Sequence, residues 1–130
     1  MESDSPLQGA HLNDAISVAM VDLYERFYGH GQIRARTFID GNVVVCVLED
    51  ILTTAELRLV GAGGSRGVID GRVAFQEATE DEFTAAVEHL TRRRVVAFLS
   101  ANQTNPGVAC ELFFLAPPFV ELAVLGGQCP

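Results

Sequence analysis

The feature that most constrains the fold is a pattern that occurs twice. Residues 15–48 contain an amphipathic helical stretch, a short turn and two strand-like stretches joined at Asp40-Gly41-Asn42. Residues 75–115 contain the same series, with the strand-like stretches joined around Asn105-Pro106-Gly107. A helix and a hairpin are too small to bury their own apolar sides, so two units are expected to complete one core. The sequence therefore predicts an α+β fold: two α-β-β units forming a four-stranded, mainly antiparallel sheet with helices packed on one face.

The length of the chain sets the number of domains. Its 130 residues suffice for one core and are too few for two. We expect a flexible lead-in over residues 1–12, a single α+β domain over residues 13–116 and an apolar tail over residues 117–130.

The first unit is predicted from residue spacing. Asn13 or Asp14 is the expected N-cap of its helix, and Gly29 the expected end. Apolar residues recur every three or four positions and so share one helical stripe: Ile16, Met20, Leu23 and Phe27. Residues 32–39 alternate as a strand, and Asp40-Gly41 is a typical hairpin turn. Residues 43–48 are apolar on both faces, which predicts a central strand.

The connection between the units contains a short helix and many glycines. Thr53 and Glu56 fit a capping box that begins a helix ending at Gly61. Residues 61–67 are predicted to be a flexible connector. A phosphate-binding loop is the alternative, but the segment has neither the required spacing nor a following lysine.

The second unit is predicted to begin with a long helix at Asp70. Thr79 and Glu82 form a second capping-box pattern, at which this helix would kink or begin again. Residues 95–99 and 108–115 are predicted strands, and residues 100–107 a polar loop.

Charge and composition exclude several kinds of partner. The net charge is −8, which disfavours binding to nucleic acid and to anionic lipid. No stretch approaches the roughly 20 apolar residues that span a bilayer, so no direct membrane insertion is expected. The N-terminus lacks a signal-peptide pattern, and three scattered cysteines suit a reducing compartment. We therefore expect a cytoplasmic protein.

The candidate binding residues lie at the two helix-to-strand turns. His30, Arg34 and Arg36 follow the first helix, and Arg93 and Arg94 follow the second. Together these side chains could bind an anion. The alternative is that arginines at the end of a helix complement its dipole and solvate the surface.

No catalytic, metal or cofactor site is predicted. His11, His30 and His89 lack the spacing of metal ligands, and no His, Ser and acid are grouped in the sequence. Cys46 and Cys110 occupy the second strand of each unit and are expected to be buried in the core. Cys129, in the tail, is expected to be exposed.

Several segments resemble the MpsC-like family of small bacterial proteins, over about residues 13–116. The first group of segments is Tyr28-Gly29-His30-Gly31-Gln32, Ala35-Arg36-Thr37-Phe38, Val44-Val45-Cys46-Val47-Leu48-Glu49-Asp50 and Leu52-Thr53-Thr54-Ala55-Glu56. The second group is Phe75-Gln76-Glu77, Val87-Glu88 and Arg93-Arg94-Val95-Val96-Ala97-Phe98-Leu99-Ser100. The family takes its name from an accessory component of a sodium-translocating, membrane-potential-generating system.

The resemblance implies a non-enzymatic, soluble accessory or regulatory protein with a membrane transport protein as its partner. The alternative is a domain that senses a small ligand or anion through the arginines at the turns. Residues 43–48 and 112–115 are apolar on both faces, so the second face of the sheet is also expected to be covered. A homodimer formed sheet to sheet would cover it, and so would the apolar residues 119–125 of the tail.

Overall fold

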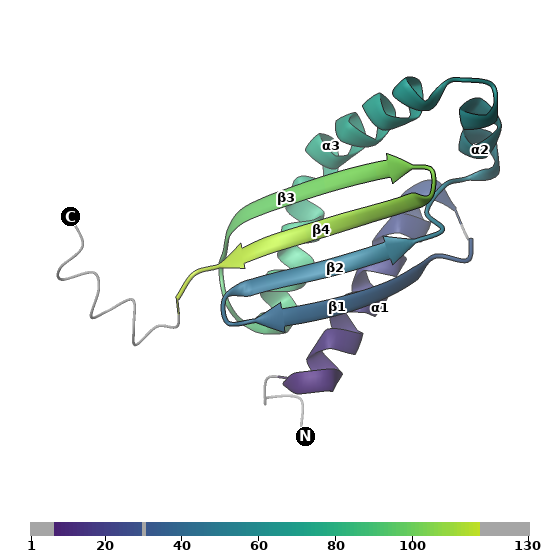
Figure 1. Ribbon diagram of the computed structural model, residues 1–130. Helices are drawn as coiled ribbons and strands as arrows, with labels where there is room; N and C mark the ends of the chain where they lie inside the picture. Colours follow the sequence, from purple (N-terminus) through teal and green to yellow (C-terminus); the bar gives the residue numbers. More distant parts are fainter. Residues whose placement is uncertain (1–6, 30, 118–130) are drawn as a thin grey trace.

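The computed structural model describes residues 7–29 and 31–117 of the chain. Along the chain, the elements are helix α1 (Gly9–Tyr28), strands β1 (Arg34–Asp40) and β2 (Val43–Glu49), helices α2 (Thr54–Gly61) and α3 (Ser65–Thr91), and strands β3 (Val95–Thr104) and β4 (Gly107–Leu115) (Figure 1). The predicted α+β class and the repeated helix-hairpin order are confirmed.

The four strands form one antiparallel sheet in the order β1-β2-β4-β3. The second strands of the two units, β2 and β4, therefore pair with each other at the centre. In this pairing Cys46 lies opposite Glu111, and Val47 lies opposite Cys110. The prediction that residues 43–48 form a central strand is confirmed.

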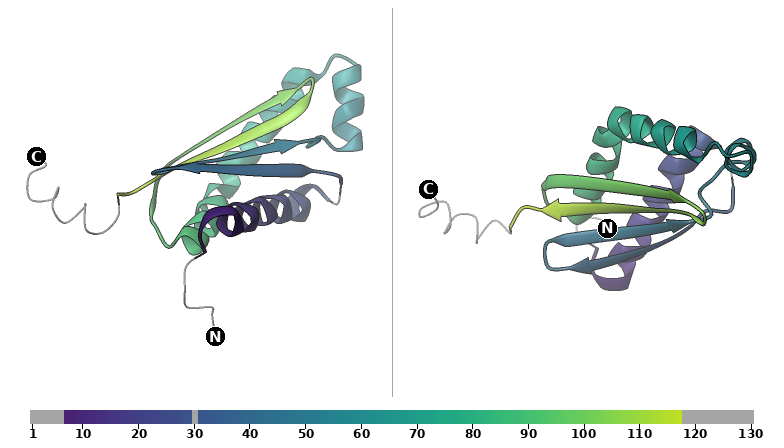
Figure 2. Two further views of the ribbon diagram at one scale, coloured as in Figure 1. Left: turned by 60° about the horizontal axis from the view of Figure 1, so that its bottom comes forward. Right: turned by 45° about the horizontal axis from the view of Figure 1, so that its top comes forward.

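The helices cover one face of the sheet, as predicted. Figure 2 shows α1 and the C-terminal part of α3 along the same side of the strands. The core between the two layers is apolar, and its largest fully buried apolar side chains come from both helices' inner faces and the two central strands: Ile16, Met20, Val87, Val44, Leu48, Phe113 and Leu115.

Helix α1 begins at Gly9, which corrects the expected start at residue 13. Its N-cap is Gln8, whose side chain makes no capping hydrogen bond. Leu12, in the additional turn, packs against the core. Burial of this apolar side chain therefore extends the helix beyond the start that Asn13 and Asp14 suggested.

Helix α3 begins at Ser65 rather than at Asp70, so residues 65–67 of the expected flexible connector are helical. Val68 and Arg72 are buried on its first turns, and this anchoring outweighs the weak helix propensity of the glycines there. The helix does not restart at Thr79. The Thr79 hydroxyl instead donates to the carbonyl of Phe75 at 2.7 Å, one helical turn earlier.

Strand β3 continues to Thr104, so the expected polar loop over residues 100–107 is mostly strand. Its side chains alternate between the two faces: Ser100 and Asn102 are half-buried on the helix side, and Ala101 and Gln103 are exposed on the other side. The polar residues fit this strand because the facing side chain on β4 is Glu111.

The expectation for the two cysteines is half correct. Cys46 is fully buried, whereas Cys110 is half-buried and points to the other face of the sheet. Because side chains alternate along a strand, the residues of β4 that share the face of Cys46 are Ala109, Glu111 and Phe113. The two cysteines are therefore not equivalent in the repeat.

Candidate functional site

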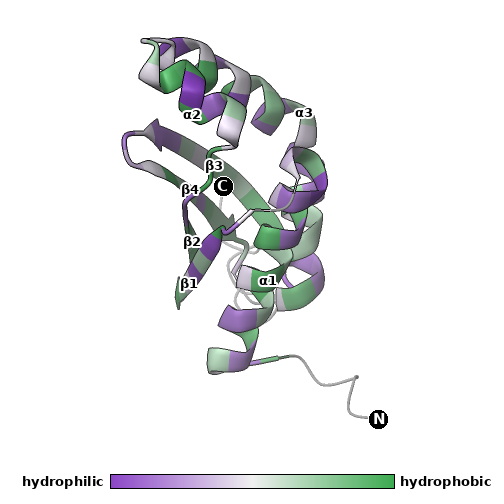
Figure 3. Cartoon of the chain, turned by 90° about the vertical axis from the view of Figure 1, so that its right-hand side faces the viewer, coloured by the Kyte–Doolittle hydropathy of each residue, from purple (hydrophilic) through white to green (hydrophobic). Residues whose placement is uncertain are grey.

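The face of the sheet that points away from the helices is apolar and uncovered by the described residues. Figure 1 looks directly onto it, and Figure 3 shows the sheet edge-on, with α1 and α3 on the opposite side. Leu99 is 59 % exposed, Phe38 54 % and Phe114 36 %. We call this surface the open face, and its apolar members are Phe38, Val43, Val45, Val47, Ala97, Leu99, Ala101, Cys110, Leu112 and Phe114.

The strand register arranges the open face in rows across all four strands. From one end to the other the rows are Arg34-Glu49-Val108-Gln103, Arg36-Val47-Cys110-Ala101, Phe38-Val45-Leu112-Leu99 and Asp40-Val43-Phe114-Ala97. The charged side chains therefore lie at the margins, and the middle rows are almost wholly apolar.

The charges at one end of the open face form exposed ion pairs. Arg34 Nη2 lies 3.0 Å from Asp50 Oδ2 and 3.5 Å from Glu49 Oε1, and Arg36 Nη2 lies 3.9 Å from Glu49 Oε2. The arginine side chains are about two-thirds exposed, so each pair contributes at most about 1 kcal/mol to stability. These arginines remain free to pair elsewhere.

On the helix side of the sheet, a buried arginine joins three elements. Arg72 on α3 is 2 % exposed. Its Nε and Nη2 donate to the two carboxylate oxygens of Glu56 on α2 at 2.9 and 2.6 Å, and Nη2 also donates to the carbonyl of Ile51 at 2.8 Å. The guanidinium carbon lies 3.7 Å from the ring centre of Tyr28 on α1. Arg72 therefore holds the start of α2 against α1 and α3.

Glu56 is shared between this ion pair and the cap of α2. The Thr53 hydroxyl accepts from the Glu56 backbone N–H at 3.1 Å, and Glu56 Oε1 accepts from the Thr53 N–H at 2.9 Å. The predicted capping box is thus confirmed. Burial would raise the pKa of Glu56, but the hydrogen bonds from Arg72 and Thr53 hold that pKa below its ordinary value.

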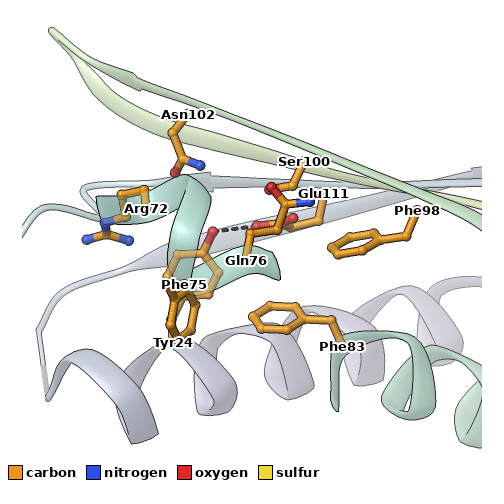
Figure 4. A pocket seen from close by; sticks show the side chains of 9 residues that line it. All are labelled: Tyr24, Arg72, Phe75, Gln76, Phe83, Phe98, Ser100, Asn102 and Glu111. Atoms are coloured by element: carbon orange, nitrogen blue, oxygen red, sulfur yellow. Dashed lines mark hydrogen bonds between the residues drawn. The ribbon is translucent and has the colours of Figure 1, made fainter. Parts of the chain in front are cut away.

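A second buried polar pair lies deeper, between α1 and β4. Tyr24 Oη donates to Glu111 Oε2 at 2.5 Å, and Glu111 is 2 % exposed (Figure 4). Burial raises the pKa of Glu111, against the lowering effect of hydrogen bonds from Tyr24 and Ser100 and of the charge of Arg72. Burial, followed by the Glu111 charge, also raises the pKa of Tyr24.

These groups surround a small internal cavity of about 10 Å³, room for a single water molecule. Its walls combine aromatic rings with polar side chains, which Figure 4 shows converging from α1, α3, β3 and β4: Tyr24, Arg72, Phe75, Gln76, Phe83, Phe98, Ser100, Asn102 and Glu111. Within the described chain, Glu111 Oε1, Asn102 Oδ1 and Arg72 Nη1 have no hydrogen-bond partner. The cavity is too small for a metabolite.

A larger cavity, of about 380 Å³, lies at the surface between the turn after α1 and the loop before α2. It is lined on one side by Gly29, Gly31 and Gln32 and on the other by residues 50–55. The two segments belong to the stretches that resemble the MpsC-like family. His30, the candidate in this turn, lies outside the described residues.

The structure does not bring the predicted anion-binding arginines together. Arg34 and Arg36 lie where β1 begins, and Arg93 and Arg94 precede β3, whose start lies at the opposite end of the sheet. Arg93 donates to the carbonyls of Gly41 at 3.2 Å and Ala116 at 2.9 Å, so it braces the end of the sheet. Equivalent turns are separated because the second strands of the two units run antiparallel.

The sequence interpretation missed Tyr24, Arg72 and Glu111. For Glu111 a signal was present, because it is the lone charged residue in the otherwise apolar stretch of residues 108–115. For Arg72 there was none, since its helix was predicted to begin only two residues earlier.

Two further findings concern the described residues only. No helix there combines the length and the apolar composition needed to cross a membrane. In residues 7–29 and 31–117, no three His, Cys, Asp or Glu side chains are placed to hold a metal ion together.

Comparison with known proteins assigns the chain to a family. A family model described as "Na+-translocating membrane potential-generating system (MpsC)" matches residues 9–117. No curated protein and no solved structure matches the chain. The match extends over both α-β-β units, the open face and the buried polar residues. The resemblance seen in the sequence is thereby confirmed, and the chain belongs to the MpsC family.

Proposed function

We propose that this protein is a non-enzymatic accessory component of a sodium-translocating, membrane-potential-generating system, and that it acts by binding other proteins. The observation that carries the proposal is the open face. It spans four strands, and the described residues leave its apolar side chains uncovered. Large contiguous apolar surfaces on a protein usually mark a protein interface.

The polar groups of the interior support a binding role over a catalytic one. Arg72 is paired with Glu56, and Tyr24 with Glu111, so each of these buried polar side chains has a partner within the protein. The cavity beside them, of about 10 Å³, has room for about one water molecule and no substrate. A catalytic site needs titratable groups with access to a substrate, and the enclosed position of these four side chains does not favour such access.

Capture from detergent-solubilised membranes of the host tests the proposal. The tagged full chain is used as bait, and the membrane-embedded components of the sodium-translocating system are detected by mass spectrometry. Enrichment of these components over an unrelated tagged protein of similar charge is the expected result. If none of them is enriched, with or without chemical cross-linking before solubilisation, the accessory role is contradicted.

A further inference from the structure

We infer that a second copy of this chain covers the open face, packed sheet to sheet about a two-fold axis. This inference rests on the proposed function, because it takes the open face as a protein-binding surface and names its partner. Aligned packing of two antiparallel sheets, about 10 Å apart, is a common way to bury two apolar sheet faces.

The charge of the open face suits a second copy. The whole chain carries a net charge of −8, so two copies repel each other over most of their surface. The open face, in contrast, has two arginines, Arg34 and Arg36, and two acids, Asp40 and Glu49, which sum to zero. Contact through this face therefore avoids the repulsion that other faces would meet.

The order of charges along β1 selects one orientation. The arginines lie at one end of the strand and Asp40 at the other. We place the two-fold axis parallel to the sheet and across the strands, midway between the row of Val45 and the row of Val47. Each strand then lies over the same strand of the second copy, and the two run in opposite directions. Arg34 then faces Asp40 of the second copy, and the opposite ends of both β1 strands are paired.

The same axis matches large apolar side chains with small ones on β3 and β4, and equal ones on β2. On β3, Leu99 faces Ala101 of the second copy, and on β4, Leu112 faces Cys110 of the second copy. Val45 faces Val47 of the second copy at the centre. Alternation of large and small side chains across two facing layers is what close packing requires.

The area of the face sets the expected affinity. Four strands about 4.8 Å apart, each with about seven residues at 3.4 Å per residue, give a face of roughly 19 by 24 Å. The two faces together have a flat area of roughly 900 Å². Because side chains make the real surface uneven, the total accessible area buried would be about 1,000–1,200 Å², at the lower end of the range for specific interfaces. We therefore expect a reversible dimer, visible between about 1 μM and 1 mM.

The first test is the molar mass of the full chain by light scattering across that concentration range, at about 0.15 M salt. Leu99→Arg should raise the dissociation constant by more than about tenfold, because the charge enters the interface twice. Val18→Arg is the matched control, since Val18 is 60 % exposed on α1, on the far side of the molecule. A monomeric wild-type protein overturns the inference, and so does a dimer that Leu99→Arg leaves intact.

The reactivity of Cys110 gives a second test. In a Cys129→Ser background, Cys110 is the accessible thiol of the described cysteines, because Cys46 is buried and its pKa is raised to about 11 by that burial. Cys110 should react slowly with a maleimide in the dimer and quickly after Leu99→Arg.

The alternatives give other results, each of which overturns the inference. A monomer with a protected Cys110 would mean that the tail of the same chain covers the face, and a monomer with a reactive Cys110 would mean that nothing does. The membrane capture separates this inference from the proposed function. A dimer without membrane partners contradicts only the accessory role, and a monomer that still captures those partners contradicts only the dimer.

Discussion

Arg72 and Glu56 form a two-point contact between helices that adjoin in the sequence, with hydrogen bonds of 2.9 and 2.6 Å. Helix α2 has no buried residue of its own. Its position on the molecule therefore depends on this contact, on the cap at Thr53 and on the turn that leads into α3.

We expect Arg72→Met to lower the free energy of unfolding by about 2–4 kcal/mol, measured by urea denaturation. Loss of one partner from a fully buried ion pair costs about 3–5 kcal/mol, and the value here is lower because the Glu56 side chain remains 17 % exposed. Methionine keeps the apolar stem, so the effect reports on the guanidinium. Arg66→Met removes an exposed arginine from the same helix and should stay within about 0.5 kcal/mol of wild type.

Thr53→Ala should cost about 1 kcal/mol in the same assay, because the first turn of α2 loses the acceptor for the Glu56 N–H. Thr54→Ala, at the neighbouring exposed position, keeps the cap and should be close to neutral. Equal effects of the two substitutions would show that the capping box does not stabilise this helix.

In the wild-type protein, Glu111 should make the free energy of unfolding fall as pH rises, and Glu111→Gln should remove this decrease. The pKa of Glu111 is raised by burial, so the folded state binds a proton more tightly than the unfolded state does. Stability from this group is therefore greatest at low pH and falls as pH rises above about 4.3, the unfolded pKa, through the folded pKa. The glutamine variant should be at least as stable as wild type at pH 8, and the advantage should vanish toward pH 4. Glu82→Gln, at an exposed acid on α3, serves as the charge control.

Glu56→Gln should show the opposite sign. The hydrogen bonds of Glu56 with Arg72 and Thr53 lower its pKa against the effect of burial, so its contribution is present above about pH 4.3 and is lost as pH falls through the folded pKa. Wild type should therefore be more stable than this variant at pH 7, with the difference vanishing in acid. Parallel pH profiles for the Glu56 and Glu111 variants would contradict this assignment.

The sequence predicted elements well where one local signal decided them. The capping box at Thr53 and the turn at Asp40-Gly41 both depend on residues that are adjacent or one turn apart. The failures occurred where distant residues decide. Helix α3 begins earlier than predicted because Arg72 hydrogen-bonds to Glu56 and to the carbonyl of Ile51. Strand β3 is longer than predicted because Ser100 lies opposite Glu111. Neither contact follows from local spacing.

In the candidate site, too, features set by local residues were predicted and features set by distant residues were not. The apolar character of both sides of the central strands was evident from the residues, and the structure places the second apolar side on the open face. The proposed grouping of Arg36 with Arg93 failed because it required the strand order, which the sequence does not contain. The buried Tyr24–Glu111 pair likewise joins residues that are far apart in the chain.

The pairing of β2 with β4 at the centre of the sheet also bears on how the chain folds during synthesis. The second strand of the first unit meets its neighbour only when residues 107–115 have left the ribosome, because no other described strand pairs with that side of β2. Until then the first helix-hairpin exposes both an apolar layer and an unpaired strand edge. A nascent chain of this protein therefore depends on strand β4 to close the core, and truncation before Glu111 should yield an aggregating fragment rather than a smaller domain.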